Sequence, residues 1–493
     1  MSSLAKISIN AAIWNFAGGG GRAIAQLFIQ VALARILGPE VFGQYAIVLA
    51  VLGIGWLIAD SGFGAALIQK TEINDADVGY ALAWVLVVAA ISGGTIAFAA
   101  NEIAVLFSAP QLVPVFRATG LLVVLQAVSN IPASLMRRAL DAKRLQLIQL
   151  TSYVFGFGLI GITLAIHGWG IWSLIASFLT QTLISTVAMY CCVLHTLRPR
   201  LRGDPSLRNF GFSVVLTNAA NWAIENLDRM VVGKIWGMPA LGAYSVTINL
   251  SRAPVGMLVG AVQSVVFASG SKVKEDLPKL RRGYLAMLGA LMLVALPLFS
   301  LLGLAAHTVI DVVYGERWND AAPLFQAFAV STPLYIITAV TGPLLWSVGK
   351  VGKDLRIQIF VVSALMAAFW IASDLPLSTA VWLIPALYLI RAVLIVGALA
   401  QEIDLRAAGI LQALRGGILI SISAALVWFL TGLVGLHGNA IDLLRIIIAA
   451  LFCALLLFFS NGYFLGVDTK ALLLSRKHDS SVARFLLRMT GTK

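Results

Sequence analysis

Charged side chains lie inside apolar, membrane-length stretches, in the two regions where this sequence repeats itself. Arg22 lies midway along the first stretch, while the seventh and eighth stretches hold Glu225, Asp228, Arg229 and Arg252. A charge at that depth costs about 2.5–3.5 kcal/mol on insertion scales, so we expect these side chains to face a polar cavity or a partner rather than lipid. Guanidinium groups there could hold an anion, and carboxylates could take up a proton or a cation. The pattern predicts movement of something charged across a bilayer.

The composition indicates an integral membrane protein. Hydrophobic residues make up 60% of the chain and charged residues 12%, against roughly 45–50% and about 25% in soluble domains. Stretches of about 20 apolar residues, each enough for one helix across a bilayer core, lie near residues 9–34, 43–68, 78–100, 113–136, 146–166, 169–195, 209–235, 241–269, 283–305, 321–348, 355–373, 376–400, 410–434 and 441–465. They lack the alternation of barrel strands, so we predict an all-α polytopic membrane protein with about 14 transmembrane helices.

The basic residues predict the orientation of these helices, because short loops rich in Lys and Arg stay on the cytoplasmic side. With both termini cytoplasmic, 26 of the 35 Lys and Arg residues fall in inside segments. The net charge of +13 therefore reflects topology and does not call for a nucleic-acid partner. Cys191, Cys192 and Cys453 lie within or at the edge of predicted spans, and neither a disulfide framework nor a metal site can be made from them.

Two short segments of the sequence repeat at an offset of 199 residues. Placing RILGPEVFGQY (35–45) over KIWGMPALGAY (234–244) aligns Gly38 with Gly237, Gly43 with Gly242 and Tyr45 with Tyr244. Transporter folds often contain two related helical halves that rock about a shared site. We therefore predict two pseudo-symmetric six-helix lobes plus two C-terminal helices, although chance alignment of glycines is the alternative. The boundaries are 1–208 for the N-terminal lobe, 209–405 for the C-terminal lobe, 406–466 for the additional helices and 467–493 for a basic cytoplasmic tail.

Polar residues line one side of several of these predicted helices. On the first, Asn15, Arg22 and Gln26 fall within about an 80° sector, and four glycines, residues 18–21, precede the arginine. On the seventh, Asn221 and Glu225 share a stripe that Asp228 and Arg229 flank. The functional interpretation is a polar cavity with a glycine hinge. The structural alternative is that the glycines pack helices and that the charges pair with one another.

Several ordered motifs carry a resemblance to a known family. They are ARILGPEVFGQYAIV (34–48), DSGFGAALIQK (60–70), SLMRRALDAKRLQLIQL (134–150), HGWGIWSL (167–174) and ENLDRMVVGKIWG (225–237). Together they resemble the polysaccharide flippase family of the Wzx or WzxC type, whose superfamily also holds lipid II flippases and antiporters of the MATE type. The resemblance runs from about residue 8 to 350 and is weak in the last four spans. It implies a flippase that translocates undecaprenyl-pyrophosphate-linked oligosaccharide repeat units across the bacterial inner membrane by alternating access, for exopolysaccharide, capsule or O-antigen synthesis.

The charged residues fit this expectation, with open alternatives. The predicted substrate-binding residues are Arg22, Arg252, Asn15, Gln26, Asn221 and Arg391, because guanidinium groups suit a pyrophosphate. The predicted gating or ion-coupling residues are Asp60, Glu225, Asp228 and Arg229, because buried carboxylates could couple H⁺ or Na⁺ to transport. They could equally be passive partners of the arginines. A MATE-type drug antiporter, a lipid II flippase, and a channel or scaffold remain as other interpretations.

The sequence does not favour an enzyme. The longest outer connection, about 306–320, is too short for a catalytic platform, and the chain contains no Walker loop. We expect no cofactor besides a coupling ion. The expected partners are the lipid-linked oligosaccharide, membrane lipids and, by way of the resemblance, a polysaccharide polymerase and a chain-length regulator. The expected location is the bacterial cytoplasmic membrane.

Overall fold

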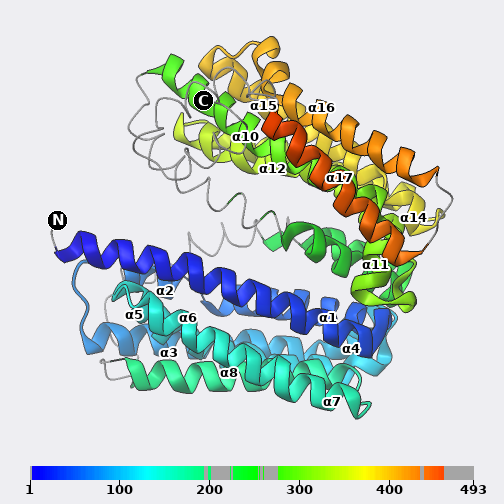
Figure 1. Cartoon of the computed structure of the whole chain (residues 1–493). Helices are drawn as coiled ribbons and strands as arrows, with labels where there is room; N and C mark the ends of the chain where they lie inside the picture. Colours follow the sequence, from blue (N-terminus) through cyan, green and yellow to red (C-terminus); the bar gives the residue numbers. More distant parts are fainter. Residues whose placement is uncertain are drawn as a thin grey trace. The chain divides into compact units, whose positions relative to one another are not determined.

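The structure is a computed structural model, and it describes the greater part of the chain. Its described residues are 3–60, 62–193, 198–200, 222–223, 226–253, 255, 259, 276–433 and 438–459, with the backbone alone for 3–13, 15–17 and 60. These residues form helices joined by short connections and contain no strand. The chain divides into two compact units, Met1–Ser245 and Val246–Lys493 (Figure 1). The all-α fold predicted from the apolar runs is confirmed.

The first unit begins with a long helix, α1 (Ser3–Asp60), which is two helices joined at a kink. At the kink Gly38 has φ 78° and ψ 176° and is followed by Pro39. Only glycine adopts such a positive φ at little steric cost, and proline removes a backbone donor, so the helical bonding is interrupted here. The two predicted spans 9–34 and 43–68 therefore meet without a loop. The second of them ends early, because the chain turns at Gly62, which has φ 70°.

The remaining helices of the first unit lie alongside α1. Tyr153 and Phe157 of the neighbouring helices pack with Leu33 of α1 in one apolar cluster. Asn74 caps its helix, since its side chain accepts a hydrogen bond from the amide of Asp77 at 2.8 Å. The helices are α2 (Phe63–Gln69), α3 (Asp75–Phe98), α4 (Ala100–Leu106), η1 (Pro110–Leu112), α5 (Val113–Arg138), α6 (Ala142–Tyr153), the π-helix η2 (Val154–Gly161), α7 (Ile162–Ile166) and α8 (Ile171–Cys192).

The two repeated segments cross each other within the first unit. Residues 226–253 are helical, and Gly237 has φ 83° there, matching Gly38 in α1. A Cβ atom on Gly43 would overlap the carbonyl oxygen of Met238, and one on Gly242 would overlap that of Pro39. Met238 and Pro39 are themselves 199 residues apart, so the contact is reciprocal. The glycines common to both segments permit this backbone-to-backbone packing.

The second unit has an apolar core formed mainly by three of its helices. Leu288 and Met292, Ile336, and Ile395 and Leu399 are members of this core. They come from α10, α12 and α15 respectively. The described helices are α10 (Leu277–Leu304), α11 (Ala306–Tyr314), η3 (Glu316–Trp318), α12 (Ala321–Ser347), α13 (Val351–Ile371), α14 (Leu377–Ala380), α15 (Leu383–Ile403), α16 (Ala407–Gly432) and α17 (Asn439–Phe459).

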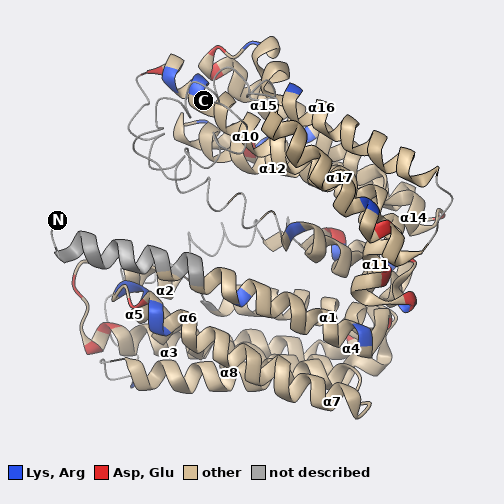
Figure 2. Ribbon diagram, viewed as in Figure 1, with Lys and Arg blue, Asp and Glu red and all other residues tan. Residues whose placement is uncertain are grey.

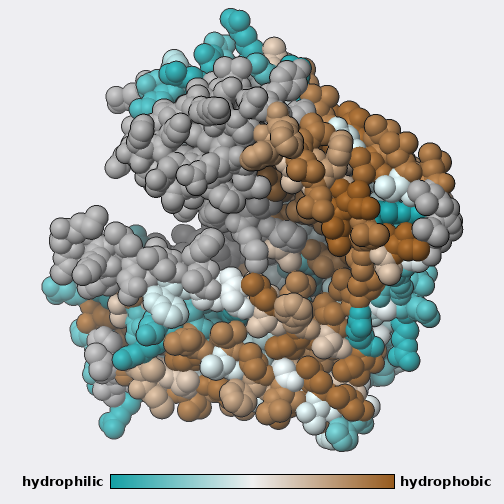
Figure 3. Space-filling view, in the orientation of Figure 1, coloured by the Kyte–Doolittle hydropathy of each residue, from teal (hydrophilic) through white to brown (hydrophobic). Residues whose placement is uncertain are grey.

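The surface of each unit is that of a membrane protein. Eleven helical segments of the described chain are long and apolar enough to cross a membrane, and the first of these, Gly18–Ala59, contains parts of both halves of α1. In the first unit most charged residues lie toward the helix ends (Figure 2), and apolar residues cover much of the described surface between the ends (Figure 3). The chain is thus a multi-pass membrane protein. The count of fourteen helices and the lobe boundaries, one of which falls at residues 208–209 outside the described residues, stay predictions.

Candidate functional site

Arg22 lies on the first half of α1 and makes its contact with α6. Its guanidinium Nη1 donates a hydrogen bond to the side-chain carbonyl of Gln149. The two helices approach closely at the glycine run, because a Cβ atom on Gly18 would lie 2.7 Å from the Cβ of Gln146. Gly19, Gly20 and Gly21 have open space beside them instead. Arg22 and Gly18 of α1 therefore face the glutamines of α6.

The surroundings of Arg22 are basic and not acidic. Among the described residues Arg22 makes no ion pair with a carboxylate, and Arg137, at the end of α5, is close enough to repel it. Lys143, in the first turn of α6, lies 5.3 Å from the ring centroid of Trp14 on α1. The structural alternative predicted a fixed ion pair for Arg22, and the described residues contain no such pair. Half-buried and bonded to a neutral amide, Arg22 keeps its positive charge, which suits an anionic ligand.

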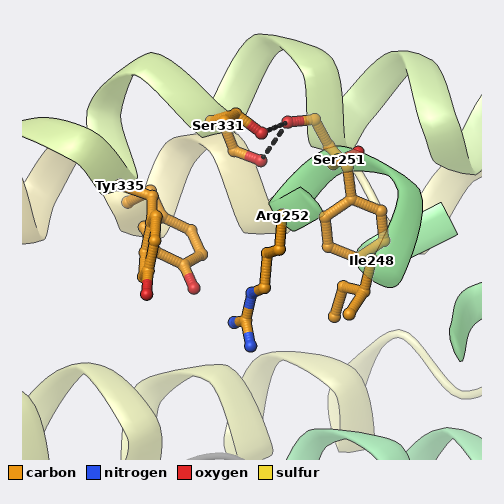
Figure 4. A pocket seen from close by; sticks show the side chains of 8 residues that line it. Ile248, Ser251, Arg252, Ser331 and Tyr335 are labelled. Carbon is orange, nitrogen blue, oxygen red and sulfur yellow. Dashed lines mark hydrogen bonds between the residues drawn. The ribbon is translucent and has the colours of Figure 1, made fainter. Parts of the chain in front are cut away.

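Arg252 lies in a pocket of the second unit, at the end of the helical residues 226–253. The pocket is partly open, with a cavity volume of about 20 Å³, and the Arg252 side chain extends into it between Tyr335 and Ile248 (Figure 4). The guanidinium carbon is 5.3 Å from the centroid of the Tyr335 ring, within the range of a cation–π interaction. Its eight lining residues are Ile248, Ser251, Arg252, Phe328, Ser331, Thr332, Tyr335 and Tyr388.

Two tyrosines give this pocket an aromatic wall. Tyr335 of α12 and Tyr388 of α15 pack edge to face, with ring centroids 6.0 Å apart and an interplanar angle of 75°. Such T-shaped pairs are a preferred aromatic geometry. The wall attracts the charge of Arg252 without neutralising it, since an aromatic ring carries no net charge. The pocket therefore combines a cation, an aromatic surface and hydroxyl groups.

Asp228 and Arg229 belong to the first unit, near the crossing of the repeated segments. The Asp228 carboxylate accepts a hydrogen bond from the Tyr244 hydroxyl at 2.9 Å and another from the Arg229 backbone amide at 2.8 Å. Tyr244 is one of the residues that the repeat aligns, and it is buried. Asp228 thus connects its helical turn to Tyr244, at the end of the repeated segment 234–244. Whether it also couples an ion stays a prediction.

The structure places the other predicted site residues only in part. Gln26 is partly exposed on α1, one turn beyond Arg22. Arg391 is partly buried on α15, three residues after Tyr388, and its Nε is enclosed without a hydrogen-bond partner among the described residues. The residues Asn15, Asn221 and Glu225 and the side chain of Asp60 lie outside what the structure describes.

Several residues of these neighbourhoods were not predicted from the sequence. Gln149 is 127 positions away from Arg22 in the sequence. The pocket residues of α12 are about 80 positions away from Arg252. One signal was present, because Phe328, Ser331, Thr332 and Tyr335 recur at the three- and four-residue spacing of one helix face. A stripe of aromatic and hydroxyl-bearing residues inside a membrane span is therefore a second signal of a candidate site, beside a buried charge.

Comparison with known proteins connects these features to a family. Residues 32–323, more than half of the chain, match the family described as polysaccharide biosynthesis protein. The chain belongs to this family. The succinoglycan biosynthesis transport protein ExoT of Rhizobium meliloti (strain 1021) is 28% identical over 326 residues, which are 64% of this chain and 65% of ExoT. The lipopolysaccharide biosynthesis protein WzxC of Escherichia coli (strain K12) is 23% identical over 335 residues, or 66% and 67% of the two chains.

Solved structures establish the fold of this polysaccharide biosynthesis family member. The lipid II flippase MurJ in an inward closed conformation matches with a TM-score of 0.72 and 14% identity, over 90% of this chain and 98% of MurJ. An inward-facing multidrug resistance transporter of the MATE family matches with a TM-score of 0.62 and 18% identity, over 77% and 94%. The chain therefore shares its fold with these two proteins, while the predicted resemblance to the polysaccharide family of ExoT and WzxC is confirmed by the sequence matches.

Proposed function

We propose that this chain is a flippase that moves undecaprenyl-pyrophosphate-linked oligosaccharide repeat units across the bacterial inner membrane by alternating access. Its membership of the polysaccharide biosynthesis family and the names of ExoT and WzxC support a role in polysaccharide export. Its fold, shared with MurJ and a MATE transporter, supports transport and not catalysis. A lipid-linked substrate would keep its tail in the bilayer while the sugars and pyrophosphate cross through the protein.

One observation supports an anionic substrate most directly. Each unit holds a guanidinium within an apolar helix: Arg22 donates a hydrogen bond to the amide of Gln149, and Arg252 lies over the ring of Tyr335. Cations at such depth are expensive to bury, so they are retained where they act on a ligand. A pyrophosphate can accept several charge-assisted hydrogen bonds from guanidinium groups. We therefore assign Arg22 to the pyrophosphate, and Arg252 to the sugar-bearing part of the same headgroup.

The crossing of the two repeated segments is the pivot that we propose for the transport cycle. Gly43 and Gly242 bring the two backbones so close that a Cβ atom on either glycine would lie 3.0 Å from the amide nitrogen of the other. Close-packed backbones resist separation but can rotate a few degrees, which makes the crossing a fitting pivot. Asp228, held by Tyr244 beside it, is the described carboxylate that we propose for gating or H⁺ or Na⁺ coupling. A polymerase and a chain-length regulator would be the partners that receive the exported units.

Deletion of the gene tests this function. We expect undecaprenyl-linked repeat units to accumulate on the inner leaflet and the polymer to disappear from the cell surface. Re-expression of the wild-type chain should restore export. If deletion instead leaves the polymer intact and sensitises cells to organic cations, the flippase proposal is wrong and a drug antiporter takes its place. Intact glycosyltransferase activity in membrane extracts serves as the control that repeat units are still made.

A further inference from the structure

The pocket around Arg252 contains a buried hydroxyl group whose hydrogen-bonding capacity is unused. Ser251 is 2% exposed, and its Oγ makes no hydrogen bond with any described residue. The two aliphatic hydroxyls on the α12 side of the lining are already engaged, because Ser331 and Thr332 donate to the carbonyl oxygen of Phe328 at 3.0 and 2.6 Å (Figure 4). A buried hydroxyl without a partner is unfavourable, so a small polar group that reached it in the cavity would stabilise it.

The aromatic wall of the pocket offers a complementary contact. The face of an aromatic ring is negatively polarised, and it attracts polarised C–H groups as well as cations. Tyr335 already faces Arg252, whereas Tyr388 meets Tyr335 edge to face and lines the same pocket from α15. A sugar ring presents hydroxyl groups at its edge and C–H groups on its faces. The lining of this pocket matches both.

Other parts of a lipid-linked oligosaccharide fit the pocket less well. Arg252 is the one charged side chain among the eight residues of the described lining, whereas a pyrophosphate carries several negative charges. A polyprenyl tail would leave the hydroxyl of Ser251 without a polar partner and would bring the guanidinium of Arg252 against hydrocarbon. The observations therefore favour the glycan over the phosphates and the tail as the occupant.

We infer that this pocket is part of a glycosyl subsite, in which one hydroxyl of a sugar enters the cavity beside Ser251 and Arg252 and Tyr388 contacts the apolar face of the ring. The inference rests on the proposed function, since it states which part of the proposed substrate this pocket holds. It gives Arg252 contact with a sugar at the glycan end of the headgroup. Arg22, which has no aromatic or hydroxyl pocket described around it, remains assigned to the pyrophosphate.

Binding to two lipids tests the subsite. The purified full-length chain is titrated with undecaprenyl pyrophosphate and, separately, with the lipid-linked oligosaccharide extracted from the deletion strain. Ser251→Ala should weaken binding of the oligosaccharide lipid roughly fivefold, which corresponds to one hydrogen bond. Tyr388→Leu should weaken it roughly tenfold. Neither substitution should change binding of undecaprenyl pyrophosphate.

Matched controls separate recognition from folding. Ser421→Ala removes a hydroxyl of α16 that lies outside the pocket lining and donates to its own helix at 2.8 Å, so both lipids should bind as they do to the wild-type chain. Ser251→Ala removes an unsatisfied group and should therefore leave thermal unfolding unchanged, which makes it decisive even where Tyr388→Leu does not fold.

Three results would overturn the inference. Wild-type affinity of Ser251→Ala for the oligosaccharide lipid would show that the hydroxyl does not touch the glycan. An equal loss for both lipids would place the phosphates in the pocket instead. If the wild-type chain binds neither lipid, the proposed function itself fails, and the subsite fails with it.

Discussion

Arg22 and Arg252 are both cations inside apolar helices, yet their surroundings differ in kind. Arg22 lies where two helices meet along stripes of glycine and glutamine, and its described acceptor is the Gln149 amide. Arg252 extends into a pocket walled by tyrosines and lies over the ring of Tyr335. An amide acceptor fixes the direction of an N–H group, whereas an aromatic ring attracts the charge with little directional demand.

The difference suggests a division of labour. A guanidinium held by one directional hydrogen bond is preorganised for a ligand of fixed geometry such as a phosphate. We propose that a guanidinium beside an aromatic ring suits a sugar, which presents oxygens at its edge and an apolar face. Charge alone does not say what each arginine binds, and we propose that their immediate neighbours decide it.

The largest effect is expected where the two sites share a support. Both arginines lie on helices that enter the glycine crossing, Arg22 before Gly43 and Arg252 after Gly242. Gly43→Val or Gly242→Val would place a branched side chain against a backbone carbonyl, and we expect a loss of at least about 3 kcal/mol in stability. Fluorescence-detected gel filtration should then show little folded protein. Gly19→Ala, beside open space, is the control and should be neutral or stabilising.

The next effect concerns Arg22 alone. Gln149→Glu would replace the neutral acceptor by a carboxylate and create a charge-assisted pair that occupies the guanidinium. We expect export to fall more than about tenfold, by analogy with the energies of charged hydrogen bonds, while the melting temperature is unchanged or raised. Export is measured as the amount of polymer on the cell surface, and stability as the thermal unfolding of the purified variant. Export at the wild-type rate would mean that Arg22 does not contact the substrate.

The smallest effect is expected at Tyr335, whose ring contacts the guanidinium of Arg252. Tyr335→Leu removes the ring beneath the guanidinium, and the loss of a partly desolvated cation–π contact should weaken binding of the lipid-linked oligosaccharide about tenfold. Tyr335→Phe keeps the ring and should bind nearly as the wild type does. Equal behaviour of the two variants would show that the aromatic ring does not position Arg252.

Much of the fold follows from the sequence, because a bilayer imposes helices on apolar segments of about 20 residues. The aligned glycines at 38 and 237 predicted matching connections, and both have a positive φ in the structure. Helix ends were less predictable. The turn at Gly62 cuts the predicted span 43–68, and the π-helix Val154–Gly161 lies inside the span 146–166 without any break in hydrophobicity.

The site was predictable as a set of charges but not as a set of contacts. The free-energy cost of placing a charge inside a membrane is enough to single out Arg22, Arg252 and Asp228 from the sequence alone. Their partners depend on which helices pack together, and that packing is decided by small residues and side-chain shape far away in sequence. Gln149 and Tyr388 are uncharged, so no local cost singles them out. The tyrosine that holds Asp228, Tyr244, was visible only as a repeated residue.

The central claim is that two guanidinium groups, one in each unit, act on one lipid-linked substrate. Its most direct test is transport of the extracted lipid-linked oligosaccharide in proteoliposomes by the wild-type chain, Arg22→Ala and Arg252→Ala, each matched for thermal stability. We predict that both variants fold and that each loses transport by about a hundredfold, in keeping with removal of a charged hydrogen bond at about 1.5–3 kcal/mol. Wild-type transport by either variant would contradict the account.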